Sequence, residues 1–169
     1  MEKQNQRKWK LIEKVVDKRI TYGAQGIMIN HIFHIIGGMK NKDHWYYNDK
    51  DEKLYILHEI ENTIDHHRII RIGDKILQFG GRDWGNDYKA TDIIKEYDLK
   101  SKQWNIRKDI RLPIALFRFG LASVLNNTFL LICGGRDIDR KVRDDIWIYS
   151  VKNKSFTKSG IKCPMTRSI

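Results

Sequence analysis

The most regular feature of the hydrophobic pattern is a short apolar run that ends in two glycines. It occurs three times, at residues 32–38, 75–81 and 129–135, so that successive glycine pairs lie 43 and 54 residues apart. Each run is largely apolar at consecutive positions, whereas a strand with one exposed face would alternate apolar and polar residues. The pattern therefore predicts three buried strands, each in a sheet that is covered on both faces.

A second feature keeps the same register. Tyr97 lies seven residues before Trp104, and Tyr149 lies seven residues before Phe156. After the first glycine pair the equivalent is weaker, with a third strand expected over residues 54–57 and Ile64 in place of the aromatic residue. With a strand before each apolar run, the sequence predicts three units of four strands; in the middle unit this first strand is expected over residues 64–69. The glycines of the motif are Gly37, Gly38, Gly80, Gly81, Gly134 and Gly135.

This order of features resembles the kelch repeat, which builds one class of β-propeller. The resemblance covers residues 22–158, and its second and third units match best. It implies an all-β fold, a partial kelch-type β-propeller of about three four-stranded antiparallel blades plus an N-terminal strand. The alternative is an unrelated β-sandwich in which the glycine pairs coincide.

The repeat divides the chain into five segments. Residues 1–19 are an N-terminal segment, 20–64, 65–112 and 113–161 are three blades, and 162–169 begin a further repeat or form a tail. Trp9 resembles the fourth-strand aromatic residue of a preceding blade, although residues 8–19 also fit an amphipathic helix. Three blades are fewer than a closed propeller contains, so we expect self-association or additional repeats outside this chain.

Composition gives the chain a positive net charge, and the motifs that the sequence lacks argue against several kinds of functional site. The chain has 32 Lys and Arg against 21 Asp and Glu, a formal net charge of +11, and two cysteines. Neither the cysteines nor the six histidines show zinc-site spacing, and the sequence holds no phosphate-binding glycine loop and no nucleophile elbow. No apolar run approaches the ~18 residues of a membrane span. We therefore predict a cytoplasmic protein without metal, cofactor or membrane contact.

The candidate site follows from a recurrence of Arg-Asp directly after Gly-Gly. In a propeller the loops that follow second strands share one face, which places these arginines together, and an arginine suits a carboxylate or phosphate. A second interpretation is that each arginine pairs with the neighbouring aspartate and stiffens its loop. Trp45, in a predicted loop over residues 39–53, either joins a contact surface or caps a blade edge. The candidate partner-binding residues are Trp45, Arg82, Asp83, Trp84, Arg136, Asp137 and Arg140.

These observations predict a non-catalytic protein-protein interaction module, whose partner is an unknown protein with an acidic segment. The net charge of +11 keeps nucleic-acid or other polyanion binding as an alternative. Against it, basic and acidic residues are interleaved along the whole chain. Some proteins of the kelch fold are enzymes, and this is the third alternative, because no catalytic set is recognisable in the sequence.

Overall fold

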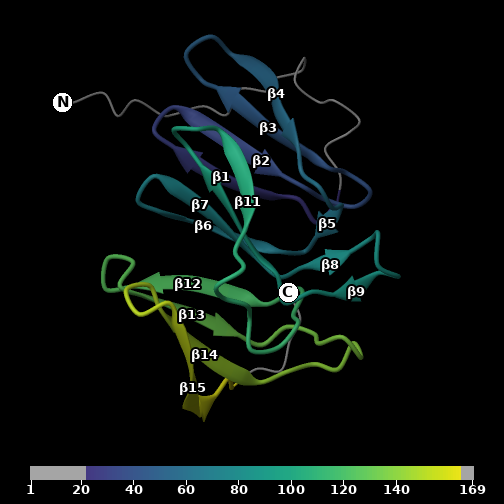
Figure 1. Cartoon of the computed structure of the whole chain (residues 1–169), viewed down its shortest axis with the longest axis vertical. Coiled ribbons are helices and arrows are strands. Elements are labelled where there is room, and N and C mark those ends of the chain that lie inside the picture. Colours follow the sequence, from purple (N-terminus) through teal and green to yellow (C-terminus); the bar gives the residue numbers. More distant parts are fainter. Residues whose placement is uncertain (1–21, 165–169) are drawn as a thin grey trace, which may run out of the picture.

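The described part of the chain is built from strands alone. The computed structural model describes residues 22–164, which form fifteen strands and no helix (Figure 1). The prediction of an all-β protein is therefore confirmed. Trp9 and the predicted strand or helix of residues 1–19 lie outside the described residues, as do residues 165–169. No helix in the described part is long and apolar enough to cross a membrane.

Sheet one contains the first four strands in sequence order. These are β1 (Gln25–Ile29), β2 (Ile32–Ile36), β3 (Asp43–Asn48) and β4 (Lys53–Glu59), and each pairs antiparallel with the next. The turn between β1 and β2 is tight, with Asn30 at a positive φ of 56°. Asparagine tolerates this left-handed conformation better than most residues, which is why it serves as a hairpin residue.

Between the second and third strands of sheet two, the chain contributes two strands to a separate three-stranded sheet, which we call the small sheet. Sheet two orders β6 (Arg68–Ile72), β7 (Lys75–Phe79), β10 (Ile94–Asp98) and β11 (Gln103–Ile106) from one edge to the other. The small sheet consists of β5 (Ile64–Asp65), β8 (Arg82–Asp83) and β9 (Lys89–Ala90). It joins the connection that enters sheet two to the loop that follows the second glycine pair.

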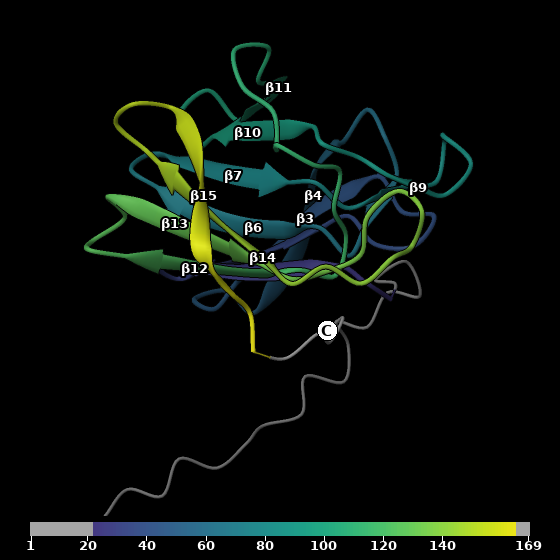
Figure 2. The same ribbon diagram turned by 90° about the horizontal axis from the view of Figure 1, so that it is seen from below.

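Sheet three again follows sequence order. Its strands are β12 (Gly120–Val124), β13 (Phe129–Cys133), β14 (Asp145–Ser150) and β15 (Ser155–Lys162), seen from below in Figure 2. The two predicted aromatic pairs are cross-strand neighbours. Tyr97 faces Trp104 with ring centroids 5.3 Å apart, and Tyr149 faces Phe156 at 4.9 Å. The Tyr-to-aromatic spacing of seven is therefore confirmed as a hairpin contact.

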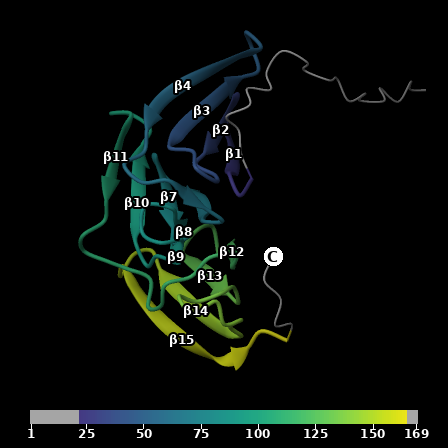
Figure 3. The same cartoon turned by 90° about the vertical axis from the view of Figure 1, so that its right-hand side faces the viewer.

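The three large sheets stack face to face along an arc. Figure 3 shows the fourth strands β4, β11 and β15 on its outer side and β1 and β12 on its inner side. One core cluster between sheets one and two is built around Ile36, Ile76 and Tyr97, and a larger one between sheets two and three contains Phe79, Phe119 and other apolar residues. Of the described strands, β6 contacts both β1 and β12, whereas no strand of sheet one contacts sheet three.

Two expectations for the strands are wrong. The third strand of the first unit is β3, not residues 54–57, which belong to β4. Trp45 therefore lies in a strand and not in a loop, and it is only 3% exposed. The first strand of the middle unit is β6, whereas Ile64 and Asp65, which we expected to begin it, form β5 and pair with the glycine loop.

Candidate interaction face

The loops after the glycine pairs gather on one side of the molecule. This side, which we call the glycine-loop face, also carries the connections between sheets and lies toward the right of Figure 1, where β5, β8 and β9 are labelled. Backbone hydrogen bonds tie the two kinds of segment together: Gly38 N donates to Ile64 O, and Gly81 N donates to Leu116 O. The face is therefore a connected surface and not a set of independent loops.

Asp65 is the centre of a buried polar cluster on this face. Its carboxylate is fully buried and accepts two hydrogen bonds from Arg82, Nε to Oδ1 at 3.1 Å and Nη2 to Oδ2 at 2.8 Å. Trp84 Nε1 donates to Oδ2 at 2.7 Å, and His66 Nδ1 lies 2.9 Å from Oδ1. Arg82 thus bridges the second glycine loop to the connection between sheets one and two.

The ionisation states follow from these contacts. Burial opposes the charge on Asp65, but the hydrogen bonds from Arg82, His66 and Trp84 outweigh it and hold its pKa below the usual carboxyl range. Burial also lowers the pKa of His66, although the Asp65 carboxylate opposes that change. The cluster therefore holds a buried carboxylate and a partly buried guanidinium that neutralise each other.

We expect Arg82→Gln to destabilise the fold by about 3 kcal/mol, because it leaves the Asp65 carboxylate buried without its cation. Arg111→Gln is the matched control: its partner Asp92 is 2.9 Å away, but both side chains are more than a third exposed. An exposed pair of this kind contributes less than about 1 kcal/mol. The measurement is the free energy of unfolding in urea. Equal stability of the two variants would contradict a structural role for Arg82.

The aspartates of the two Arg-Asp pairs share a local role. Asp83 Oδ1 accepts the backbone N–H of Gly85 at 2.8 Å, and Asp137 Oδ1 accepts that of Asp139 at 3.0 Å. Each carboxylate therefore closes its own loop two residues further on, as Asx turns do. Neither is hydrogen-bonded to the arginine that precedes it, so the two arginines are held by other groups.

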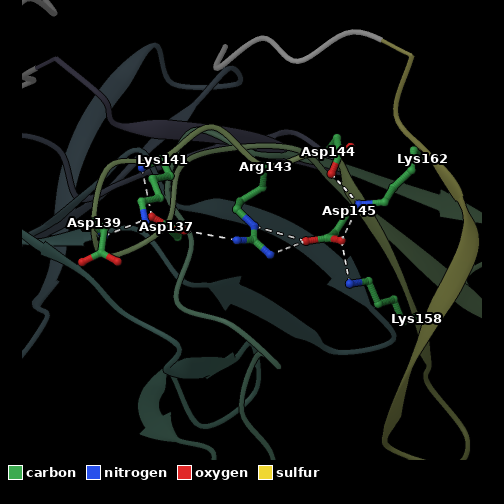
Figure 4. Close-up of polar contacts among 8 residues, drawn as sticks. All are labelled: Asp137, Asp139, Lys141, Arg143, Asp144, Asp145, Lys158 and Lys162. Atoms are coloured by element: carbon green, nitrogen blue, oxygen red, sulfur yellow. Dashed lines mark hydrogen bonds and ion pairs between the residues drawn. The ribbon is translucent and has the colours of Figure 1, made fainter.

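The third loop is tied to its sheet through Arg143, as Figure 4 shows. Arg143 Nη1 lies 3.5 Å from Asp137 Oδ2, and its Nη2 donates to Asp145 Oδ2 at 2.7 Å. Lys158 and Lys162 of β15 also contact the buried Asp145 carboxylate, at 2.7 and 3.1 Å. Hydrogen bonds from Lys158 and Arg143 hold the pKa of Asp145 far below its usual range. These cations are already neutralised within the protein.

A group of aromatic side chains with cations beside them is the part of the face that remains open. Tyr22 is 61% exposed, and its hydroxyl accepts a hydrogen bond from Arg118 Nη2 at 2.8 Å. Trp84 packs edge-to-face against the exposed Tyr88 ring at 4.4 Å, and Lys40 Nζ lies 5.7 Å from the Trp84 ring. We call Tyr22, Lys40, Trp84, Tyr88 and Arg118 the aromatic-cation patch.

Neither cation of the patch forms an ion pair with any described carboxylate. The buried cluster joins its two halves, because the Tyr22 ring lies against His66 and the Arg82 guanidinium lies 5.4 Å from the Trp84 ring. Charge on Lys40 and Arg118 is thus available to an external group, whereas that on Arg82 is not.

The predicted site residues are only partly brought together. Arg82, Asp83 and Trp84 lie at the buried cluster, while Arg136, Asp137 and the exposed Arg140 lie in the third loop. Trp45, in β3, is buried and does not offer a contact surface. Sequence reasoning missed Tyr22, Lys40 and Tyr88. Tyr22 had a signal, since Tyr22-Gly23 of the first unit matches Phe119-Gly120 of the third.

Within residues 22–164 no three His, Cys, Asp or Glu side chains are placed to share a metal ion. His34 and His44 approach each other, with Nδ1 of His34 2.9 Å from Nε2 of His44, but without a third such ligand.

No protein-family model matches the sequence. Among solved structures, 172 chains match significantly, and one is the structure of YjhT, a β-propeller. It superposes on 85% of this chain with a TM-score of 0.72 at 13% sequence identity, and the match covers 52% of that chain. This chain therefore spans about half the length of the structure that it matches. A likeness at this identity concerns the fold alone. The chain has the fold of part of a β-propeller, in which the three large sheets are blades.

Proposed function

We propose that this chain is a kelch-type, non-catalytic protein-interaction module that binds an acidic segment of a partner through the glycine-loop face. The observation that carries the proposal is the aromatic-cation patch. Exposed Tyr22 and Tyr88 flank Lys40 and Arg118, two cations without a described carboxylate partner. Tyr, Trp and Arg are the residues enriched where protein interfaces have their largest binding energies. The kelch class is inferred from the glycine pairs and the Tyr97–Trp104 and Tyr149–Phe156 pairs.

The partner chemistry follows from the charges. A carboxylate that reaches Arg118 can accept from the guanidinium while an apolar neighbour packs on the Tyr22 ring. Lys40, at the Trp84 ring, offers a second positive contact. An acidic peptide with one or two apolar side chains therefore suits the patch better than a purely polyanionic chain does.

The test is a displayed peptide library selected against the purified protein. We expect the selected peptides to be rich in Asp and Glu, with aromatic or aliphatic residues between them. Lys40→Glu combined with Arg118→Glu should weaken their binding at least about tenfold by loss of two charge-assisted contacts. Lys152→Glu, in the turn between β14 and β15 on the opposite side, is the control and should leave binding within about twofold. Peptides without acidic residues, or binding that survives the double change, would contradict the proposal.

The net charge of +11 favours nucleic acid as a second candidate. Many of the described cations are already paired, among them Arg82, Arg107 and Arg143. A salt titration with nonspecific duplex DNA separates the two functions. Tight binding that falls steeply with salt would favour nucleic acid over the acidic-peptide proposal.

A further inference from the structure

A cavity of about 360 Å³ opens between the first two blades, on the side opposite the glycine-loop face. We call it the turn-side cavity, because the β1–β2, β6–β7 and β10–β11 turns contribute Asn30, Asp74 and Lys102 to its lining. Its volume lies within the range of pockets that hold small molecules. Ile29, Leu57 and Leu99 provide apolar wall.

Three side chains, Trp104, His44 and His34, are hydrogen-bonded in series. The directions of these bonds determine which ring nitrogen of His34 carries a proton. Trp104 Nε1 donates to His44 Nδ1 at 3.2 Å, and an indole N–H can only donate. His44 is therefore neutral with its proton on Nε2, which lies 2.9 Å from His34 Nδ1 and donates to it. His34 must then carry its own proton on Nε2, as a neutral ring with one outward donor.

His34 keeps this state because the residue is only 5% exposed, and burial lowers its pKa to about 4. No described residue accepts a hydrogen bond from Nε2. The hydroxyls of Tyr46 and Tyr97, which also line the cavity, likewise have no described partner. Tyr97 is 1% exposed. Three side chains thus bring unpaired polar groups to one cavity, and two of them are more than nine-tenths buried.

The charge around the cavity is positive. Arg71 and Lys102 line it and form no ion pair with a described carboxylate. Asp74, the carboxylate in the lining, is engaged by Lys100 at 2.7 Å. A donor-rich, positively charged cavity with an apolar wall is complementary to a small organic anion. Phosphate would use the donors but leave the apolar wall without a contact.

We propose that the turn-side cavity binds a small carboxylate with an aromatic or branched apolar body. The carboxylate accepts hydrogen bonds from His34 Nε2 and the Tyr97 hydroxyl, and Arg71 and Lys102 attract its charge. The apolar body packs against Ile29, Leu57 and Leu99. This site is separate from the aromatic-cation patch, so the two proposals stand or fall independently.

The probe is benzoate, with the isosteric neutral amide benzamide as its charge control, followed by amide shifts in two-dimensional NMR of the whole chain. We expect benzoate to shift the amides of Asn30, Leu57 and Leu99 in a saturable way, and benzamide to bind at least about tenfold more weakly. Absence of saturable shifts at about 20 mM benzoate, shifts confined to other regions, or equal binding of benzamide would each overturn the proposal.

Variants locate the contacts. Tyr97→Phe keeps the ring and removes one donor, so benzoate binding should weaken about fivefold, and Arg71→Gln with Lys102→Gln should weaken it at least about tenfold. The controls are Tyr55→Phe, beside the lining residue Tyr46, and Lys152→Gln, in the turn between β14 and β15; both positions lie outside the lining, and both variants should stay within about twofold. If a cavity variant does not fold, the comparison of benzoate with benzamide on the unmodified chain still decides the proposal. Equal weakening in the controls would assign the effect to general surface charge and overturn it.

Discussion

Replacement of Gly81 by valine is expected to leave the chain largely unfolded, with a loss of more than about 4 kcal/mol. Gly81 has a φ of +109°, a conformation that a β-branched residue avoids. A Cβ at this position would also lie 2.4 Å from Ile64 Cγ2, 2.8 Å from the Asp65 carbonyl and 2.8 Å from His67 Cβ. The conformation and the approach of a second backbone both exclude a side chain, so no rotamer relieves the clash.

Gly73→Ala is the matched control for conformation alone. Gly73 also has a positive φ, +58°, but a Cβ there would meet nothing within 4 Å. We expect this variant to lose only about 1 kcal/mol, the cost of the left-handed backbone. Thermal and urea unfolding of both variants provide the measurement. A Gly81→Val protein that melts like Gly73→Ala would show that the glycine pair is not a contact between backbones.

The second large effect is on stability in mild acid. Between about pH 7 and about pH 5 the free energy of unfolding is expected to fall by about 4 kcal/mol, a large part of the total of a domain of this size. Burial lowers the pKa of His34 to about 4 and that of His67 to about 3. Both side chains have a pKa near 6.5 in the unfolded chain.

The sign follows from proton binding. Below about pH 6.5 the unfolded chain protonates both histidines while the folded chain does not, so each proton favours unfolding. The stabilisation is complete above about pH 6.5 and disappears as the pH falls through about 4 for His34 and about 3 for His67. Asp145 stays ionised across this window, because Lys158 and Arg143 hold its pKa far lower. At pH 5 each of the two histidines accounts for about 2 kcal/mol.

Urea midpoints at the two pH values measure the effect, with the slope of the transition held as a check on two-state unfolding. His34→Gln should reduce the difference between the pH values by about half, whatever it does to stability at neutral pH. His31→Gln is the control, since His31 is well exposed beside Asp49 and should leave the difference unchanged. Equal midpoints at both pH values for the unmodified chain would contradict the burial of neutral histidines.

The sequence determined the strands that repeat closely. Runs that are apolar at consecutive positions before Gly80 and Gly134 predicted β7 and β13. The spacing of seven residues from a tyrosine to an aromatic residue predicted the hairpins formed by the third and fourth strands of sheets two and three. These signals are local in the chain, because a strand's two faces and a short hairpin are set by neighbouring residues. The prediction for the first unit was wrong because this local signal is altered there. Its tyrosine is Tyr47, paired with Leu54 seven residues later, and the aliphatic partner concealed the pattern.

Only the tertiary structure decided what each charged or polar side chain does. Arg82 and Arg136 both follow a glycine pair, and the backbone of each pairs with an inter-sheet connection, Arg82 with Asp65 and Arg136 with Phe117. Because the first partner is an aspartate and the second a phenylalanine, the Asp65 carboxylate binds the Arg82 side chain, and Phe117 offers no such group to Arg136. Likewise, nothing in the sequence linked Trp104 to His44, sixty residues away, or fixed the proton on His34. Hydrophobic periodicity assigns a residue to one face of its own strand. It carries no information about which distant side chain the opposing sheet or connection places against that face, and this pairing sets burial, charge and hydrogen-bond direction.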